Sequence, residues 1–175
     1  MGPMFSGKST ELIRRCSNAS SVGLKVCIIN HTYDTRCDEA SVQTHYGVVA
    51  KALKIQNLLQ VNINEYDVIG IDEAQFFDDL TEFVKINEKN KKVLILAGLD
   101  GDFQRQPFGN VLNVIPFCQN VTKLNAMCIA CKNGITNAAF TYRNSTCTNT
   151  ICVGGKDIYQ ALCRKHYLEV FTPST

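Results

Sequence analysis

The segment GPMFSGKST at residues 2–10 constrains the fold of this chain more than any other feature. It matches the pattern G-x-x-x-x-G-K-[ST], with Gly2, Gly7, Lys8 and Ser9 at the defined positions. Glycines let the backbone turn until successive N–H groups point at phosphate oxygens, and the N-terminus of the following helix adds partial positive charge. Lys8 would add a charge for the outer phosphates and Ser9 a hydroxyl ligand for Mg²⁺. The motif therefore predicts a phosphate-binding loop between a strand and a helix.

Only Met1 precedes this loop in the sequence. The strand that leads into such a loop normally lies between neighbours in the sheet. We therefore expect this first strand to be missing, and the chain to be less stable or less active without it.

Three continuous apolar segments predict strands covered on both faces, because none shows the polar alternation of a half-exposed strand. They are KVCIIN at 25–30, YDVIGIDE at 66–73 and KVLILAGLD at 92–100. The segment TELIRRC at 10–16 has helical spacing directly after the phosphate loop. A second helix is predicted at 76–90. Strands and helices in this order indicate βαβ units and an α/β fold with a parallel sheet.

The predicted helix at 76–90 is defined by four apolar residues on one face, Phe76, Leu80, Phe83 and Val84. Taken from the pattern alone, such residues belong to a core rather than to a binding site. The same interpretation applies to Cys16 and Cys27, which we expect to be small buried side chains.

The composition excludes several classes of protein. A chain of 175 residues that is 45% apolar and 19% charged can bury the core of one domain with a small appended module. The net charge of +2 does not by itself indicate a nucleic-acid or membrane partner. No apolar run approaches the roughly 18 residues of a membrane span, and no signal peptide opens the sequence. Nine cysteines in such a chain are expected to be reduced, buried or metal-bound.

Two carboxylates, Asp72 and Glu73, end the apolar segment VIGIDE, where a metal-binding acid of a phosphate-loop enzyme belongs. Successive residues of a strand point to opposite faces. Asp72 would then face Mg²⁺ while Glu73 faces a second substrate, as a kinase requires. A solvated loop acid is the alternative interpretation of Glu73.

A second, polar unit begins near Cys128, where regular periodicity ends and cysteines become frequent. Cys128 and Cys131 form C-x-x-C, and Cys163 and His166 form C-x-x-H, with thirty-one residues between the two pairs. Three thiolates and one imidazole suit tetrahedral Zn²⁺ with no open position, so a structural zinc site is predicted. A redox-active C-x-x-C is the alternative. The predicted units are 1–125 for the α/β domain, 126–170 for the zinc-binding unit and 171–175 for a tail.

Taken together, these motifs resemble the type II thymidine kinases of cytosol, bacteria and large DNA viruses. The resemblance covers nearly the whole chain, through GPMFSGKSTELIRR, YDTR, VIGIDEAQFFDDL, AGLDGDFQRQPFGN, KLNAMCIAC and VGGKDIYQALCRKHY. It implies an ATP-binding α/β domain with a zinc-tethered lid, or lasso, that closes over the nucleoside. The implied reaction transfers the γ-phosphoryl group of ATP to the 5′-hydroxyl of thymidine or deoxyuridine, in deoxynucleoside salvage for DNA synthesis.

The resemblance also implies residue roles. The ATP phosphates and metal would be held by Gly2, Pro3, Met4, Phe5, Ser6, Gly7, Lys8, Ser9, Asp34, Thr35, Arg36, Asp72 and Gln75. Glu73 would be the general base. Met4, Phe76, Leu99, Phe103 and Phe108 would line the thymine pocket. The lid residues Thr150, Ile151, Cys152, Val153 and Gly154 would contact the base through main-chain groups, and Tyr159 would reach the nucleoside. Magnesium would be held by Ser9 and Asp72.

The resemblance further implies a cytoplasmic homo-oligomer, commonly a tetramer, that binds ATP and thymidine and neither nucleic acid nor a membrane. Two other classes remain open from the residues alone. One is a zinc-ribbon nucleic-acid module, favoured by five basic residues against Asp157 alone between 128 and 167; the basic–aromatic interleaving of single-strand binders is absent from that sequence. The other is an ATPase acting as a switch, which leaves GGKDIYQALC unexplained.

Overall fold

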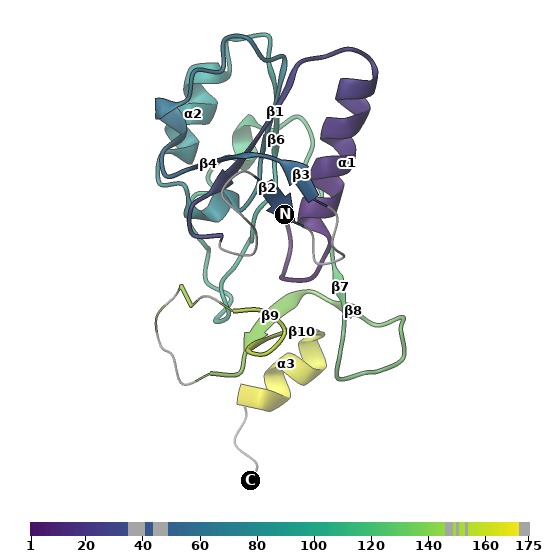
Figure 1. Ribbon diagram of the computed structural model, residues 1–175. Helices are drawn as coiled ribbons and strands as arrows, with labels where there is room; N and C mark the ends of the chain where they lie inside the picture. Colours follow the sequence, from purple (N-terminus) through teal and green to yellow (C-terminus); the bar gives the residue numbers. More distant parts are fainter. Residues whose placement is uncertain (35–40, 44–48, 146–148, 150, 153, 172–175) are drawn as a thin grey trace.

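A four-stranded parallel sheet forms the centre of the larger unit in the computed structural model, which describes residues 1–34, 41–43, 49–145, 149, 151–152 and 154–171 (Figure 1). The strands are β1 (Val26–His31), β4 (Leu53–Ile55), β5 (Val68–Ile71) and β6 (Val93–Leu96), in the order β4-β1-β5-β6. Every neighbouring pair is parallel, and Ile29 of β1 lies opposite both Leu53 and Ile71. The predicted α/β fold with a parallel sheet is confirmed.

Helix α1 (Lys8–Ser21) covers one face of this sheet (Figure 1). Its buried side chains are Leu12, Ile13 and Cys16, which have the spacing that predicted the helix. Gly70 in β5 permits the close packing, because a Cβ atom there would lie 2.7 Å from the sulfur of Cys16. Both Cys16 and Cys27 are buried, as expected.

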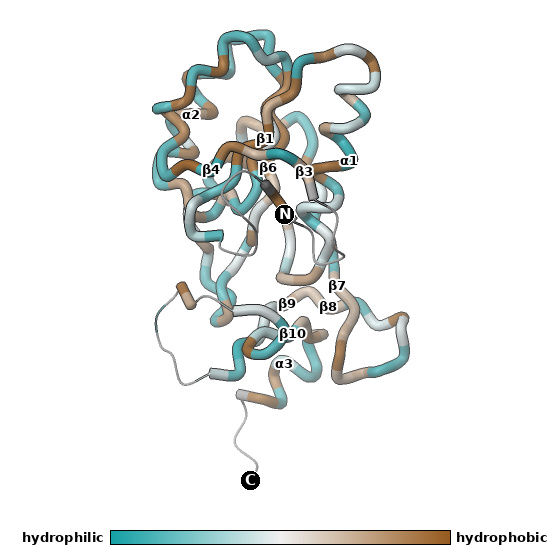
Figure 2. Tube along the Cα trace, in the orientation of Figure 1, coloured by the Kyte–Doolittle hydropathy of each residue, from teal (hydrophilic) through white to brown (hydrophobic). Residues whose placement is uncertain are grey.

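Helix α2 (Leu80–Asn87) lies over the opposite face with two short 3-10 helices, η1 (Leu58–Gln60) and η3 (Ile115–Phe117). The alternation along β1 separates the two faces, since Ile28 packs toward α1 whereas Cys27 and Ile29 belong to the core beneath α2. Figure 2 shows the apolar character of these central strands.

The prediction of one helix over 76–90 is wrong in its first turn. Residues Ala74–Phe76 form a separate 3-10 helix, η2, and α2 begins only after Asp79 at its N-cap. The main-chain oxygen of Asp79 accepts the first helical hydrogen bond, from Phe83, whereas its carboxylate makes no cap to α2 and accepts the N–H of Leu59 at 3.0 Å. Leu80, Phe83 and Val84 are buried together, whereas Phe76 lies outside α2.

Strand β6 differs from the prediction of burial on both faces. All four residues of β5 are buried, but Val93 is 54% exposed and the other three residues of β6 are half-buried. The cause is a groove of about 520 Å³ between β6 and the segment 117–124. Within the described residues, β6 pairs only with β5.

Met1 lies at one end of this groove. Its amino group donates to the main-chain oxygen of Thr122 at 3.0 Å, and the N–H of Leu124 donates to the oxygen of Met1 at 2.8 Å. These two bonds have the pattern of neighbouring parallel strands. Gly2 follows with φ 152°, and any Cβ atom there would collide with the main-chain oxygen of Leu124. The start of the phosphate loop is therefore fixed on segment 122–124.

Two further strands, β2 (Ser41–Gln43) and β3 (Val49–Lys51), pair antiparallel beside this unit. Val42 is fully buried against Ile13 of α1 and Ala52.

The smaller unit contains β7 (Ala126–Met127), β8 (Asn137–Ala138), β9 (Phe140–Arg143), β10 (Tyr159–Leu162) and α3 (Arg164–Phe171). β7 pairs with β8, and β9 pairs antiparallel with β10. Its core is small, with Ala126, Ala138 and Ala161 prominent in it. Helix α3 includes Phe171, which the predicted boundary assigns to the tail. None of the described helices is both long enough and apolar enough to cross a bilayer.

Candidate active site and metal centre

The phosphate loop turns tightly between Met1 and α1. The main-chain oxygen of Pro3 accepts two hydrogen bonds, from the Lys8 ammonium at 2.7 Å and from the Ser6 hydroxyl at 2.8 Å. Gly7 stands at the N-cap of α1 in the left-handed conformation, and its oxygen accepts the N–H of Glu11 at 2.9 Å. The first turn of α1 thus begins at Lys8 and Ser9, beside the loop.

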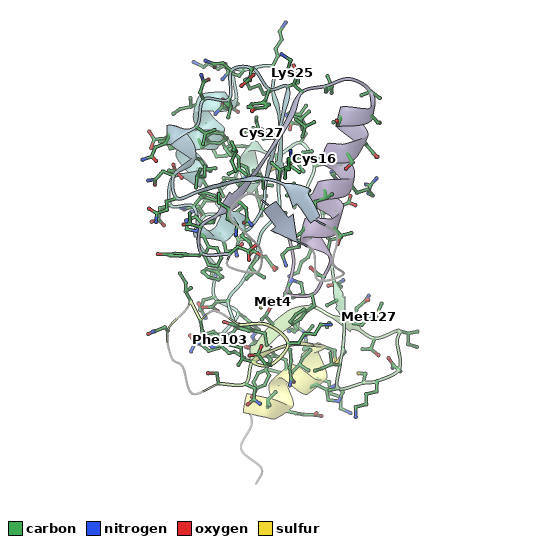
Figure 3. All side chains as sticks on the ribbon, viewed as in Figure 1. Met4, Cys16, Lys25, Cys27, Phe103 and Met127 are labelled. Carbon is green, nitrogen blue, oxygen red and sulfur yellow. The ribbon has the colours of Figure 1, made fainter. Side chains whose placement is uncertain are left out.

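A cavity of about 320 Å³ lies between this loop, the ends of β1, β5 and β6, and the smaller unit. Most of the site residues predicted from the sequence line it, namely Met4, Phe5, Gly7, Lys8, Ser9, Asp34, Glu73, Gln75, Phe76, Leu99, Phe103, Phe108, Ile151, Cys152, Gly154 and Tyr159. Figure 3 shows Met4 and Phe103 at the junction of the two units. Segments from the start, middle and end of the chain therefore share one space.

Eight of the ATP- and nucleoside-site residues predicted from the sequence are not among those that line the cavity. Gly2, Pro3, Ser6 and Asp72 do not line the cavity. Thr35, Arg36, Thr150 and Val153 lie outside the described residues.

The cavity has further lining residues that the sequence did not single out: Thr10, Tyr33, Gly101, Asp102, Thr141 and Gly155. Most adjoin a recognised motif and could have been found from that proximity. Thr141 carries no such signal. Its hydroxyl oxygen accepts a hydrogen bond from the N–H of Met4 at 2.9 Å, which joins β9 to the phosphate loop.

The two acids after β5 diverge. Asp72 is 1% exposed and its N–H donates to the oxygen of Ile29 at 2.8 Å, so it continues the sheet. Glu73 turns into the left-handed region, with φ 50° and ψ 41°, and faces the cavity. Of the two acids, only Glu73 therefore lines the cavity.

A third acid, Asp34, is buried at the end of β1. The Asn30 amide donates to its carboxylate at 2.8 Å, and the Lys54 ammonium donates to its main-chain oxygen at 2.7 Å. Carboxylate and hydroxyl oxygens are the ligands that Mg²⁺ prefers. The donor set of Ser9, Asp34 and Asp72 is therefore chemically suited to this ion.

Aromatic rings form one wall of the cavity. The rings of Phe76 and Phe108 meet edge to face, with centroids 5.7 Å apart and an angle of 88°. Behind them lies His31, whose ring is 5.6 Å from Phe76 and 4.6 Å from Tyr33. Burial lowers the pKa of His31, which favours the neutral ring in this apolar setting.

Contacts within the smaller unit hold the opposite wall. The hydroxyl of Tyr159 donates to the main-chain oxygen of Cys152 at 2.7 Å. The Arg143 guanidinium lies 3.6 Å from the ring centroid of Phe103 and donates to the oxygen of Asn149 at 2.6 Å. The strand pair β9–β10 thus contacts both the lid segment and the cavity.

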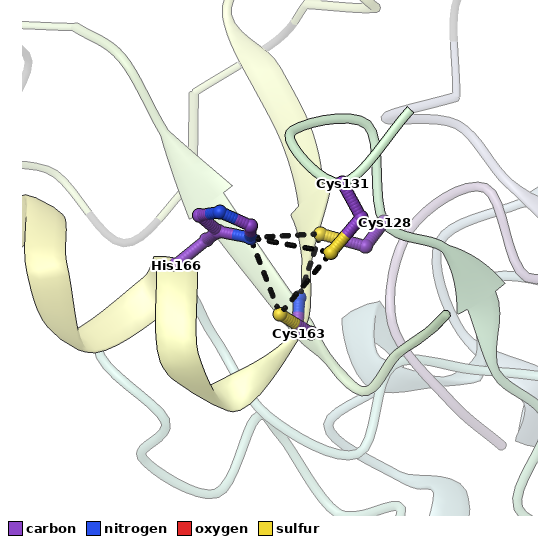
Figure 4. Close-up of side chains that lie close together, drawn as sticks. All are labelled: Cys128, Cys131, Cys163 and His166. Atoms are coloured by element: carbon purple, nitrogen blue, oxygen red, sulfur yellow. Dashed lines mark hydrogen bonds between the residues drawn. The ribbon is translucent and has the colours of Figure 1, made fainter. Parts of the chain in front are cut away.

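Four metal-ligand side chains converge away from the cavity (Figure 4). Nδ1 of His166 lies 3.5 Å from the sulfur of Cys128 and 3.4 Å from those of Cys131 and Cys163. The sulfurs of Cys131 and Cys163 are 3.9 Å apart. Zn–S bonds of about 2.3 Å and Zn–N bonds of about 2.0–2.1 Å at tetrahedral angles separate ligand atoms by roughly 3.5–3.8 Å. The cluster therefore has the dimensions of a zinc site.

The surroundings of the cluster favour its metal-binding form. Burial would raise the pKa of Cys128, but N–H donors led by that of Cys163, at 3.3 Å, lower it to about 6. The other ring nitrogen of His166 lies 3.9 Å from the Glu169 carboxylate. Carboxylates near a ligating histidine are a common outer shell of zinc sites.

The glycine-rich loop beside a parallel sheet, with acids at the adjoining strand ends and an aromatic-walled cavity, is typical of phosphate-loop enzymes. The Cys3His cluster in the smaller unit is a second feature, which limits the phosphate-loop enzymes that the chain can resemble. The chain belongs to the thymidine kinase family, whose sequence model, described as "Thymidine kinase", matches residues 1–167.

Individual relatives agree with this assignment. Thymidine kinase a of Arabidopsis thaliana is 45% identical over 176 residues, which cover 96% of this chain and 73% of the plant protein. The thymidine kinase of Monkeypox virus is 43% identical over 171 residues, covering 97% of this chain and 94% of its own. That of Vaccinia virus (strain Western Reserve) is 42% identical over 171 residues, with the same coverage. The predicted family and kinase class are confirmed.

Proposed function

We propose that the 320 Å³ cavity is the place where this kinase transfers the γ-phosphoryl group of ATP to the 5′-hydroxyl of thymidine, and also of deoxyuridine. One observation carries the proposal. The phosphate loop, Glu73 and the aromatic wall of Phe76 and Phe108 all line the same cavity. A nucleoside stacked on the wall would place its hydroxyl between an acid and a phosphate-binding loop.

The phosphate side of the cavity is assigned to ATP. Main-chain N–H groups of residues 5–8 and the Lys8 ammonium would hold the β- and γ-phosphates, while the N–H of Met4 stays bonded to Thr141. Ser9, Asp34 and Asp72 would hold Mg²⁺, which when bound neutralises charge on the transferred group. Lys8 now donates to Pro3, so nucleotide binding would exchange this internal bond for one to phosphate.

The other side is assigned to the nucleoside. Glu73 would accept the proton of the 5′-hydroxyl as the oxygen–phosphorus bond forms and the bond to the leaving ADP breaks. Leu99 and Phe103 would complete the apolar surface for the base. Main-chain groups of the lid, Thr150–Gly154, would read the base edge, while the bond from Tyr159 to Cys152 supports that lid.

The cluster of Cys128, Cys131, Cys163 and His166 is assigned a structural Zn²⁺. Its four ligand atoms lie within 4.8 Å of one another. All four positions of a tetrahedral ion would be filled by the chain, so the ion would contribute folding energy rather than catalysis. We also assign residues 1–125 and 126–170 to separate nucleotide-binding and zinc-binding units.

We extend the proposal to a cytoplasmic homo-oligomer, a tetramer by family resemblance. Three reduced thiols in the zinc cluster suit a reducing compartment. Light scattering of the purified protein would test the tetramer.

A coupled assay of ADP release with and without thymidine tests the function itself. We expect release to depend on thymidine, because the nucleoside hydroxyl is the acceptor. ADP release at the same rate without thymidine would contradict the proposal and favour an ATPase.

A further inference from the structure

Gln75 follows Glu73 by two residues, within the 3-10 helix η2, and is 3% exposed. Both the nitrogen and the oxygen of its side-chain amide make hydrogen bonds. The nitrogen donates to Oε2 of Glu73 at 2.6 Å, and the oxygen accepts the main-chain N–H of Leu99 at 2.9 Å. The amide therefore spans the space between the acid and the cavity wall.

The orientation of this amide follows from its partners. The N–H of Leu99 can only donate, so the atom facing it must be the amide oxygen. The NH₂ group consequently faces Glu73 and donates to its Oε2. If the amide were reversed, its NH₂ group would face the N–H of Leu99, and two donors would oppose each other. The main-chain N–H of Leu99 thus determines that Glu73 faces the NH₂ group of Gln75.

Packing leaves the amide little room to move. A Cβ atom at Gly98 would lie 3.0 Å from the Gln75 amide oxygen. A Cβ atom at Gly109, where φ is 56°, would collide with the main-chain oxygen of Gln75. The N–H of Ala74 also donates to the oxygen of Ala97 at 2.9 Å, which joins η2 to the end of β6. Gly98 and Gly109 therefore pack closely against Gln75, which only residues without a Cβ atom allow.

Glu73 itself needs such support. Its backbone is in the left-handed region, which a residue with a side chain enters at an energetic cost. A glutamate side chain in a roomy cavity has several rotamers, and only some aim its carboxylate at an acceptor hydroxyl. The short hydrogen bond from the confined Gln75 amide favours those rotamers that keep Oε2 of Glu73 beside it.

We propose that Gln75 is a positioning residue that aims the Glu73 carboxylate, rather than a contact to ATP. This inference rests on the proposed role of Glu73 as the base. The amide acts before the proton moves, by holding one carboxylate oxygen in place. Loss of the amide should lower kcat and leave the binding of both substrates nearly unchanged.

The first variant is Gln75→Met, which keeps the length and volume of the side chain but removes its donor and acceptor. We expect kcat to fall at least about tenfold, a part of the roughly 10²- to 10⁴-fold contribution of a general base. The KM values for ATP and thymidine should stay within about twofold. A raised KM for ATP with unchanged kcat would overturn the proposal and make Gln75 a nucleotide contact.

A second variant isolates the donor. Gln75→Glu keeps an acceptor toward Leu99 but places a carboxylate against Glu73, which repels it. Its kcat should fall at least as far as that of Gln75→Met. The matched control is Asn87→Leu, which removes a buried amide bonded to Phe83 within α2 and away from the cavity. This control should lower the melting temperature while kcat stays within about twofold, because the cavity is untouched.

Combination with Glu73→Gln decides whether Gln75 acts through Glu73. If it does, adding Gln75→Met to Glu73→Gln should change kcat by less than about twofold, since residues acting as a unit are not additive. The full single-variant loss on the Glu73→Gln background would overturn the positioning role. The single variant Glu73→Gln distinguishes failure of the proposed base from failure of the positioning role. An unchanged kcat in Glu73→Gln would overturn the role of Glu73 as the base. A reduced kcat in Glu73→Gln together with full kcat in Gln75→Met would overturn only the inference about Gln75.

Discussion

The hydroxyl of Tyr167 donates a hydrogen bond to the main-chain oxygen of Phe103, at 2.5 Å. Tyr167 lies on α3 one residue after His166 of the Cys3His cluster, whereas Phe103 lines the cavity. The guanidinium of Arg105 lies 4.9 Å from the Tyr167 ring and strengthens the same junction. The Cys3His cluster and the cavity are therefore linked through adjacent residues of α3 and this hydrogen bond.

Tyr167→Phe should raise the KM for thymidine about two- to tenfold, the effect of one hydrogen bond of roughly 0.5–1.5 kcal/mol. Phe103 loses an anchor, and the pocket wall becomes less defined. Steady-state kinetics at saturating ATP measure the change. Tyr66→Phe, in the core of the larger unit, is the control. An unchanged KM in Tyr167→Phe would show that Phe103 is held by other contacts.

One zinc ion per chain should be found by elemental analysis of protein purified without chelator. Protein without zinc would contradict the assignment of Cys128, Cys131, Cys163 and His166. Replacing Cys131 by serine should raise the KM for thymidine more than that for ATP, because the lid belongs to the metal-binding unit. An equal rise in both would indicate general unfolding.

Glu73→Gln should remove most turnover and leave ATP and thymidine binding nearly intact. The amide keeps the shape of the side chain but cannot accept the proton, so the loss falls on kcat. Single-turnover kinetics with calorimetric binding separate the two effects. A kcat within about threefold of the parent is well short of a general-base contribution and would exclude Glu73 as the base.

Thymidine, deoxyuridine and 5-substituted deoxyuridines should be accepted, and deoxycytidine and purine nucleosides should be poor substrates. The lid is proposed to pair with O4 and N3–H of the base, and cytosine reverses both donor and acceptor at this edge. Buried polar groups left unpaired can give selectivity of about 10⁴-fold or more. Comparable kcat/KM for deoxycytidine would remove the proposed role of the lid.

An apolar, strand-forming segment of about eight residues joined to Met1 should raise both the melting temperature and the affinity for ATP. The groove beside β6 lies open at Met1, and Met1 already bonds to segment 122–124 in the parallel pattern. A strand there would pair with β6 and add to the two hydrogen bonds that already hold Met1 on segment 122–124. An extension of equal length made of glycine and serine is the control. Equal melting points and affinities would show that the groove does not take a strand.

Much of the fold follows from local sequence pattern. The spacing of Leu12 and Cys16 predicted α1, and unbroken apolar runs predicted β1 and β5. The exposure of β6 could not be predicted, because it depends on what lies beside the strand rather than on its own residues. The start of α2 was missed because Phe76 continues an apolar helical spacing across Asp79, the N-cap.

The site divides in the same way. Motif spacing predicted Lys8, Glu73 and the ligand pairs of the metal cluster, because each chemistry requires a fixed local arrangement. Leu99 and Phe76 could not be assigned to the cavity from pattern alone, since the same side chains would serve equally well in a core. Thr141 and the amide oxygen of Gln75 acquire their partners, Met4 and Leu99, only through tertiary contacts.

The fit of Cys16 against Gly70 also makes this thiol a reporter of motion. Burial, with a contribution from Cys27, raises the pKa of Cys16 to about 11, and alkylating reagents attack the thiolate. Its modification therefore requires α1 to separate from the sheet. The rate at excess reagent would report how often that separation occurs in the native protein, as amide hydrogen exchange does. Because α1 begins at the phosphate loop, slower modification with ATP present would measure how far the nucleotide closes this opening.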